Sequence, residues 1–310
     1  MSQKIVLTHF SAPGSRARRW RWFREKFVEF ILFSAAASSV LVTAGIVWTL
    51  ISESIPFFKN VSLWDFITGT EWTPTFENAK FGILPLLGGT FLSTFIGLIV
   101  AIPLGTIAAA YLSEYMKPQV REIVKPILEL LAAVPTVVYG YFALLFVTPL
   151  LQQLFPQIQG FNILAAGLVI GFMIIPYVSS LSEDAMRAVP NHFREASLAL
   201  GASQFQTTIR VVIPGAFSGI SSAYVLAISR ALGETMVVAI AGGNQPQLTM
   251  DPTQPAATIT AFIVQISQGD LPHGSIGYQS IYVAGLTLFV ITFSFNVLGL
   301  WIRKRIQEKE

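Results

Sequence analysis

Five long stretches of this chain contain no Lys, Arg, Asp or Glu, and they constrain its fold more than any other feature. They are residues 30–52, 81–113, 130–182, 211–229 and 271–302, with lengths of 23, 33, 53, 19 and 32 residues. The hydrocarbon core of a bilayer is about 30 Å thick, and about 20 apolar helical residues cross it. Each stretch is therefore long enough to cross a membrane as a helix.

The composition places the whole chain in the same class. Charged residues make up 12% of the 310 residues, whereas soluble domains contain about 25%. Hydrophobic residues make up 53%, and the mean hydropathy is +0.61. That is more apolar surface than a water-soluble core of this length needs to bury. The chain has no cysteine, which excludes disulfides and thiol chemistry.

The longest stretch must contain two helices. As one helix, its 53 residues would be about 80 Å long, and the polar segment 152–160 interrupts it. We therefore expect an all-α integral membrane protein with six transmembrane helices. The expected spans are residues 28–52, 82–112, 128–151, 162–182, 211–234 and 278–302. The uncharged segment 256–268 is too short to span, and it predicts an amphipathic or re-entrant helix on the outer side.

The positions of Lys and Arg predict the orientation. Seventeen of the 20 lie in the N-terminal tail, the second and fourth connections and the C-terminus. Cytoplasmic segments carry this excess, so both termini are expected in the cytoplasm. The expected organisation is a basic cytoplasmic tail (1–27) at the membrane surface, a first helix with an extracytoplasmic segment (28–80), a transmembrane domain (81–303) and a cytoplasmic C-terminus (304–310). Nucleic-acid binding by the tail is disfavoured.

Residues 183–210 form the longest cytoplasmic connection and contain signals for a short helix. Asn191 is a plausible N-cap, Gly201 suits the end of the helix, and Ser203 with Gln206 matches a capping box for the next one. A helix of about ten residues is marginal alone in water, so something should pack against it. Lipid headgroups and a groove on another protein are both possible partners.

The chain lacks the residues of several enzyme classes. No Gly-Lys pair occurs, so there is no phosphate-binding loop for ATP hydrolysis. His9, His192 and His273 are far apart and have no carboxylates at metal-site spacing, so no metal or cofactor is expected. An intramembrane enzyme is disfavoured, because no nucleophile or metal ligand stands beside Arg230 and Glu234 at the end of the expected fifth span.

The fourth connection resembles the EAA loop of ABC-importer permeases. That loop has the pattern EAA, three residues, G, nine residues, I-x-L-P. Here it is matched in spacing by Glu195-Ala196-Ser197, Gly201 and Val211-Val212-Ile213-Pro214. The resemblance implies a coupling helix within residues 190–214, in which Glu195, Ala196 and Gly201 dock onto a cytoplasmic ATP-binding subunit.

Further segments resemble the C-type permease subunit of phosphate-specific transport (Pst) systems. They are Thr70 to Pro74 with Phe81 to Pro85, Pro135 to Gly140 and Arg230 to Met236. The resemblance implies a type I ABC importer permease fold in the bacterial inner membrane. It also implies a heterodimer with an A-type permease, two ATP-binding subunits that hydrolyse ATP and an extracytoplasmic phosphate-binding protein. Sulfate, molybdate or an organic solute, and a role as a phosphate sensor or scaffold, remain alternatives.

Arg230 and Glu234 are the candidate residues for a substrate pathway. An ionisable group at membrane depth costs about 2.5–3.5 kcal/mol unless it is paired or faces water. Their i, i+4 spacing allows an ion pair on one helix face. The pair is either purely structural or part of an oxyanion site, in which Arg230 donates to the anion and Glu234 keeps binding weak. Thr235 follows and could line the same route.

Overall fold

The computed structural model describes residues 15–269, 271–272 and 274–307. The first half of the predicted tail, residues 1–14, and the last three residues of the predicted C-terminal segment therefore lie outside it, as do His9 and His273. The regular structure of the described residues is helical, apart from two isolated bridges. The all-α prediction is confirmed.

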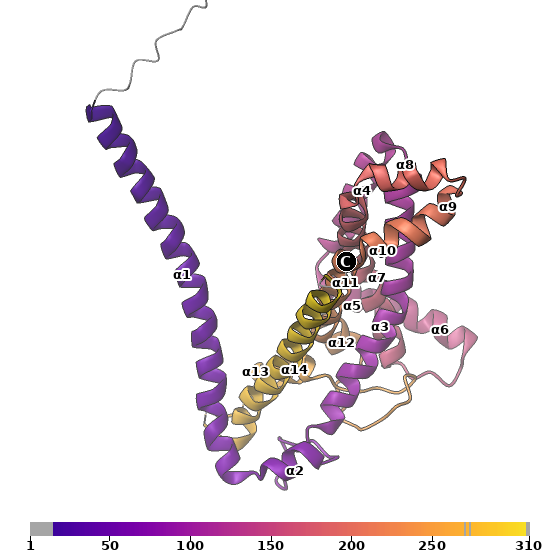
Figure 1. Cartoon of the computed structure of the whole chain (residues 1–310). Helices are drawn as coiled ribbons and strands as arrows, with labels where there is room; N and C mark the ends of the chain where they lie inside the picture. Colours follow the sequence, from indigo (N-terminus) through magenta and orange to yellow (C-terminus); the bar gives the residue numbers. More distant parts are fainter. Residues whose placement is uncertain (1–14, 270, 273, 308–310) are drawn as a thin grey trace, which may run out of the picture. The chain divides into compact units, whose positions relative to one another are not determined.

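The helices are labelled in Figure 1 in chain order. They are α1 (Ser15–Asn60), α2 (Leu63–Thr68), α3 (Leu84–Ala110), η1 (Tyr111–Tyr115), α4 (Pro118–Ala132), α5 (Thr136–Phe142), η2 (Ala143–Val147), α6 (Thr148–Leu154), α7 (Ile163–Ala188), α8 (Asn191–Ala199), α9 (Gln204–Thr207), η3 (Thr208–Val212), α10 (Ile213–Gly215), α11 (Phe217–Leu232), α12 (Met236–Ala241), α13 (Ile259–Ser267) and α14 (Ile276–Gln307). The chain divides into two compact units, residues 1–49 and 50–310. Everything from α2 onward belongs to the second unit.

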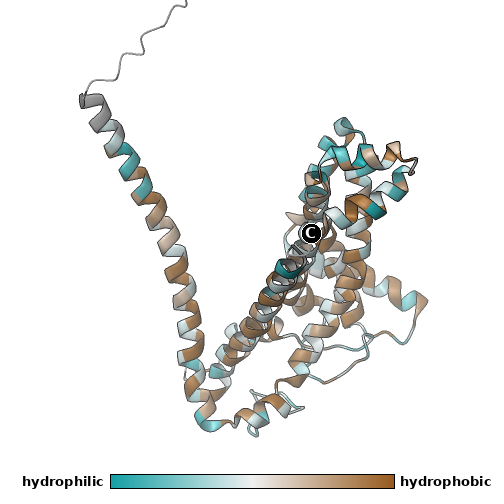
Figure 2. Ribbon diagram, viewed as in Figure 1, coloured by the Kyte–Doolittle hydropathy of each residue, from teal (hydrophilic) through white to brown (hydrophobic). Residues whose placement is uncertain are grey.

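The described residues contain five helices that are long and apolar enough to cross a membrane, or six if one bent pair counts as a span. The five single spans are Trp22–Asn60, Leu84–Tyr115, Thr136–Leu154, Ile163–Arg187 and Ile276–Trp301. The bent pair is Gln204–Gly215 with Phe217–Leu232, at an angle of 72°. Hydrophobic residues dominate α3 and α14, whereas α8 and α9 carry many hydrophilic ones (Figure 2).

Three predicted spans differ from the observed helices. The first was expected over residues 28–52, but α1 extends from Ser15 to Asn60. The third was expected to begin at residue 128, but α4 ends at Ala132 and the spanning helix begins at Thr136. Pro135 has no N–H and an extended backbone, with φ −56° and ψ 133°, so it ends one helix before the next begins. The fifth span bends between Gly215 and Phe217, where Ala216 has φ −94° and ψ 3°.

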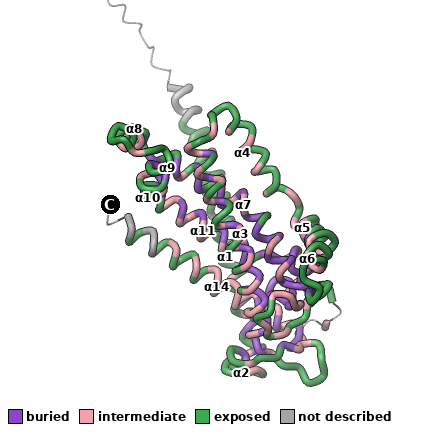
Figure 3. The backbone as a smooth tube through the Cα atoms, turned by 90° about the vertical axis from the view of Figure 1, so that its right-hand side faces the viewer, coloured by how far each residue is buried: buried purple, intermediate pink, exposed green. Residues whose placement is uncertain are grey.

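The core of the second unit lies between α3 and α7, where small residues allow close approach. A Cβ atom added to Gly105 on α3 would lie 2.6 Å from Cβ of Val178, and one added to Gly171 on α7 would lie 2.7 Å from Cβ of Val100. Buried residues run along both helices, and α4 and α8 are largely exposed (Figure 3). The glycine-rich second span therefore packs within a bundle.

A second cluster lies around α2, at the end of this unit opposite α8 (Figures 1 and 3). Trp72 is fully buried, and its ring centre lies 5.0 Å from that of Phe262 on α13 in an edge-to-face contact. Phe57 and Phe66 complete an aromatic cluster around it. The short helix expected within residues 256–268 is confirmed as α13. The Trp-Thr-Pro segment supplies the centre of this cluster.

Candidate functional site

The chain leaves helical geometry for three residues between α11 and α12. α11 ends at Leu232, Gly233 is its C-cap, and α12 begins at Met236. The backbone carbonyl of Glu234 accepts a hydrogen bond of 2.7 Å from the hydroxyl of Thr260, a buried residue on α13. In a continuous helix this carbonyl would accept a hydrogen bond from a backbone N–H of the next turn. Here the Thr260 hydroxyl is the donor instead. The break is thus held in place by tertiary packing.

Arg230, in the last turn of α11, forms an ion pair with Glu234 inside this break. Nη1 of Arg230 lies 3.4 Å from Oε2 of Glu234, whose side chain is only 2% exposed. The Arg230 side chain is 35% exposed, and its guanidinium carbon lies 5.8 Å from the centre of the Tyr177 ring on α7. The last distance is within cation–π range. The predicted pairing is confirmed, although Glu234 lies beyond the end of the helix.

The pair leaves the Arg230 guanidinium able to bind something else. A guanidinium has five N–H donors. Among the described residues, Arg230 makes only the ion pair and the ring contact, and it donates no hydrogen bond. Glu234, in contrast, is a buried carboxylate that needs a nearby cation. The arrangement suits a site at which an anion approaches Arg230 while Glu234 competes for the same charge.

Thr235 lies in the break next to this pair. Its hydroxyl donates a 3.2 Å hydrogen bond to the carbonyl of Gly233, so it is engaged within the non-helical segment. The side chain is half-buried. The structure therefore brings Arg230 and Glu234 together and places Thr235 beside them, with its hydroxyl already bonded.

The fourth connection folds as the predicted short helix, α8. Gly201 has a φ of +85°, a left-handed conformation that favours glycine. The N–H of Gly201 donates to the carbonyl of Leu198, and the N–H of Ala202 donates to the carbonyl of Ser197. This pair of hydrogen bonds is a Schellman motif. The capping box of Ser203 and Gln206 is also confirmed. The prediction of Asn191 as the N-cap was wrong by one residue: the extended Pro190 holds that position.

The three residues of the EAA-like pattern that are expected to dock face outward, whereas Val212 at its end is fully buried. Glu195, Ala196 and Gly201 are all exposed, and nothing lies within 4 Å of a Cβ atom added to Gly201. Large apolar side chains on the same connection are exposed too, and Leu200 is 90% exposed. Exposed apolar residues grouped on one segment mark a surface for a partner.

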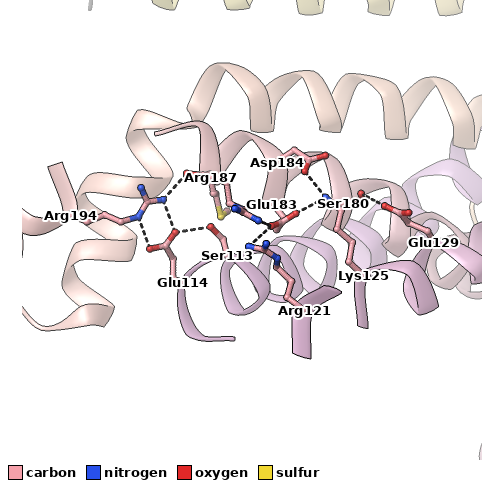
Figure 4. A network of polar contacts seen from close by, with 11 residues as sticks. Ser113, Glu114, Arg121, Lys125, Glu129, Ser180, Glu183, Asp184, Arg187 and Arg194 are labelled. Atoms are coloured by element: carbon pink, nitrogen blue, oxygen red, sulfur yellow. Dashed lines mark hydrogen bonds and ion pairs between the residues drawn. The ribbon is translucent and has the colours of Figure 1, made fainter. Parts of the chain in front are cut away.

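Arg194 ties α8 to the end of the α3 span. Its Nε and Nη2 atoms donate to the two carboxylate oxygens of Glu114 over 3.0 and 2.9 Å. Its Nη2 and Nη1 atoms also donate to the carbonyls of Met186 and Val189, at 2.7 and 2.6 Å. Figure 4 shows this side chain between Glu114 and the end of α7. One guanidinium thus joins three helical segments.

A second charged cluster joins α4 to α7 (Figure 4). Nζ of Lys125 lies 2.6 Å from Oε2 of Glu183 and 2.5 Å from Oδ1 of Asp184. Glu183 is 1% exposed, and Arg121 and Arg187 approach its Oε1 at 3.7 and 3.8 Å. Burial alone would lower the pKa of Lys125, but the hydrogen bonds to Asp184 and Glu183 outweigh it and raise the pKa.

Sequence reasoning did not identify several residues of these sites. The i, i+4 spacing of Glu183 and Arg187 was a usable signal. The contacts made by Glu114, Lys125 and Tyr177 join residues more than 50 positions apart and leave no local pattern. Within the described residues, no group of three or more His, Cys, Asp or Glu side chains could hold a metal ion.

Comparison with known proteins gives a consistent result. Residues 101–308 match the family described as "Binding-protein-dependent transport system inner membrane component". A probable ABC transporter permease protein, YqgH of Bacillus subtilis, is 33% identical over 87% of this chain and 88% of its own length. The phosphate transport system permease protein PstC of Mesorhizobium japonicum is 32% identical over 89% of both chains.

Solved structures show the same fold. The chain is similar to one from a bacterial ABC transporter that imports alginate, with a TM-score of 0.63 and 14% identity over 92% of this chain and 99% of that one. It is also similar to a chain of the inward-facing MetNI methionine ABC transporter, with a TM-score of 0.52 and 18% identity over 73% of this chain and 94% of that one.

Proposed function

Because this chain belongs to the family of binding-protein-dependent transport inner membrane components, we propose that it is the C-type permease subunit of an ATP-driven importer of inorganic phosphate. It is a multi-pass membrane protein with the type I ABC importer permease fold. The observation that carries phosphate as the solute is the 32% identity to a PstC permease over 89% of both chains.

The Arg230–Glu234 pair supplies a physical basis for this substrate. Phosphate is a tetrahedral oxyanion, and a guanidinium matches its geometry through paired N–H donors. Glu234 lies 3.4 Å away and competes with the anion for Arg230, which keeps binding weak. Transport requires this weakness, because a solute that binds too tightly does not leave.

The chain would act with four further subunits. An A-type permease would build the other half of the pathway, two ATP-binding subunits would lie below the pair, and an extracytoplasmic binding protein would deliver phosphate. ATP hydrolysis would belong to the partner chains, since this sequence contains no Gly-Lys phosphate loop. The excess of Lys and Arg in alternate connections supports cytoplasmic termini.

Coupling would pass through α8. Glu195, Ala196 and Gly201 are exposed on this helix and its Schellman ending, as a docking surface for the ATP-binding subunit requires. When ATP closes the two ATP-binding subunits, the coupling helices would approach each other, and the bundle would change from inward-facing to outward-facing.

The test is uptake of radioactive phosphate by the complete complex in proteoliposomes supplied with ATP and the loaded binding protein. Phosphate should accumulate, and a tenfold excess of sulfate or molybdate should not compete. Competition by either anion would instead favour a permease for that solute. Phosphate binding without accumulation would favour a membrane sensor or scaffold.

A further inference from the structure

The attachment of α8 to the rest of the molecule is unusual, because this helix contains no buried side chain. Within Asn191–Ala199, only Arg194 and Ser197 are half-buried, and the other residues are exposed. A helix held by apolar packing would bury a stripe of side chains. Apart from the backbone links at either end, the contacts of these two polar residues are therefore the main attachment of α8 to the membrane helices.

Arg194 makes the stronger of the two attachments. It donates two hydrogen bonds to the Glu114 carboxylate, and the Glu114 side chain is 7% exposed while that of Arg194 is 17% exposed. A bidentate guanidinium–carboxylate contact fixes orientation as well as distance. Two carbonyls at the end of α7, those of Met186 and Val189, occupy the remaining side of the same guanidinium.

Glu114 also holds the far side of the connection. It lies in η1, which continues α3, and its backbone carbonyl accepts a hydrogen bond from the side-chain amide of Gln204 on α9. The Ser197 and Thr207 hydroxyls meet at 2.9 Å and connect α8 to α9. Both limbs of the helical hairpin formed by α8 and α9 therefore meet the end of the α3 span at one residue.

We propose that Arg194 and Glu114 are positioning residues that transmit the displacement of α8 to α3 and α7. The proposal rests on the coupling role given to α8 above. When the ATP-binding subunit moves α8, the two fixed hydrogen bonds pull the end of α3, and the carbonyl contacts pull the end of α7. Without the pair, only the backbone links at the two ends of α8 transmit its displacement, and less of it reaches the end of α3.

Arg194→Lys is the first test, because lysine keeps the charge but cannot donate to both carboxylate oxygens and both carbonyls at once. In proteoliposomes, the ATP hydrolysed per phosphate imported should rise roughly fivefold or more, within the range of allosteric couplings. Arg210→Lys is the matched control. It makes the same change in the same connection at an exposed side chain that has no ion pair among the described residues, and its ratio should equal that of the wild type.

Glu114→Gln is the second test and removes the other partner while keeping its shape. All ratios are measured per assembled complex, so a loss of folded protein does not imitate uncoupling. If Arg194→Lys does not assemble, the ATP hydrolysed per phosphate imported by Glu114→Gln is the test of the proposal. A wild-type ratio in either assembled variant overturns the proposal.

A distance measurement tests the role of the Arg194–Glu114 contact without reference to the solute. Because the chain has no cysteine, spin labels can be placed through His192→Cys on α8 and Ile107→Cys on α3, at two exposed side chains to which no docking role is assigned. In a complex whose other subunits lack cysteine, this distance should stay constant when ATP binds, and it should change by several ångströms in Arg194→Lys.

The outcomes separate the two proposals. If the distance does not change in Arg194→Lys when ATP binds, the proposed role of Arg194 and Glu114 is wrong, whatever the solute is. A second outcome is that the wild-type complex imports no phosphate, but the distance changes with ATP only in the variants. In that case the role of Arg194 and Glu114 is supported and the assigned solute is wrong.

Discussion

The ammonium of Lys125 on α4 lies 2.6 Å from the carboxylate of Glu183 on α7. This contact fixes α4, a helix that buries none of its own side chains. Glu183 is 1% exposed, so it depends on its cationic neighbours for stability. Electrostatic contacts thus attach both α4 and α8 to a bundle whose centre is apolar.

Removing this cation should destabilise the fold. Lys125→Gln leaves Glu183 with Arg121 and Arg187 at 3.7 and 3.8 Å, so we expect a loss of about 2 kcal/mol, typical of a hydrogen bond to a charged group. Thermal unfolding in detergent measures it. Lys117→Gln, at an exposed lysine that forms no ion pair among the described residues, should leave the midpoint unchanged. Equal midpoints for all three proteins would contradict the assigned role of Lys125.

The same contact predicts a pH dependence. The pKa of Lys125 is raised above its ordinary value of 10.5, so the folded protein holds this proton more tightly than the unfolded chain. Its contribution is complete below about pH 10.5 and is lost as the pH rises through the folded-state pKa. The difference in unfolding midpoint between wild type and Lys125→Gln should be constant from pH 7 to 9 and narrow in stronger alkali. A difference in midpoint that widens as the pH rises would contradict this prediction.

The Arg230–Glu234 pair allows structure and transport to be separated. Arg230→Gln leaves a buried carboxylate without its partner and should lower both stability and phosphate uptake. The double variant Arg230→Gln with Glu234→Gln removes both charges, so it should regain stability but still import phosphate at less than about one tenth of the wild-type rate. Copurification checks assembly. Recovery of uptake in the double variant would leave the pair a purely structural role.

Gly201 should be sensitive to substitution because of its backbone conformation. Alanine fits the space, since nothing lies within 4 Å of the added Cβ atom, but φ is +85°. A left-handed residue other than glycine costs about 1–2 kcal/mol. Gly201→Ala should therefore weaken binding of the ATP-binding subunit about fivefold, and Gly201→Asn should weaken it less. Titration of the labelled subunit measures this. Gly160→Ala, also at an open position but without positive φ, should bind normally.

Glu195 should affect docking alone. Its side chain is exposed and forms no ion pair among the described residues, so Glu195→Ala should change stability by less than about 0.5 kcal/mol. Binding of the ATP-binding subunit should nevertheless weaken. Unfolding midpoints and copurification give the two readouts. Normal copurification together with normal coupling would remove Glu195 from the docking surface.

Much of the fold could be predicted because its signals are local. The spans follow from runs of uncharged residues, and the end of α8 follows from Gly201 and the capping box of Ser203 and Gln206. Each signal depends on residues within a few turns of one another. The span boundaries were less predictable, because a proline does not by itself mark the end of a helix: Pro135 separates two helices, whereas Pro103 and Pro176 lie inside one.

The sequence alone determined that this chain is a helical membrane protein with short non-spanning helices within residues 190–214 and 256–268, and with the i, i+4 spacing of an ion pair at Arg230 and Glu234. Only the tertiary structure decided which charges meet. Arg194 and Glu114 are 80 residues apart, and Lys125 and Glu183 are 58 apart. Hydrophobic runs and caps act through neighbours in the chain, whereas these ion pairs form only after α3, α4, α7 and α8 have packed together.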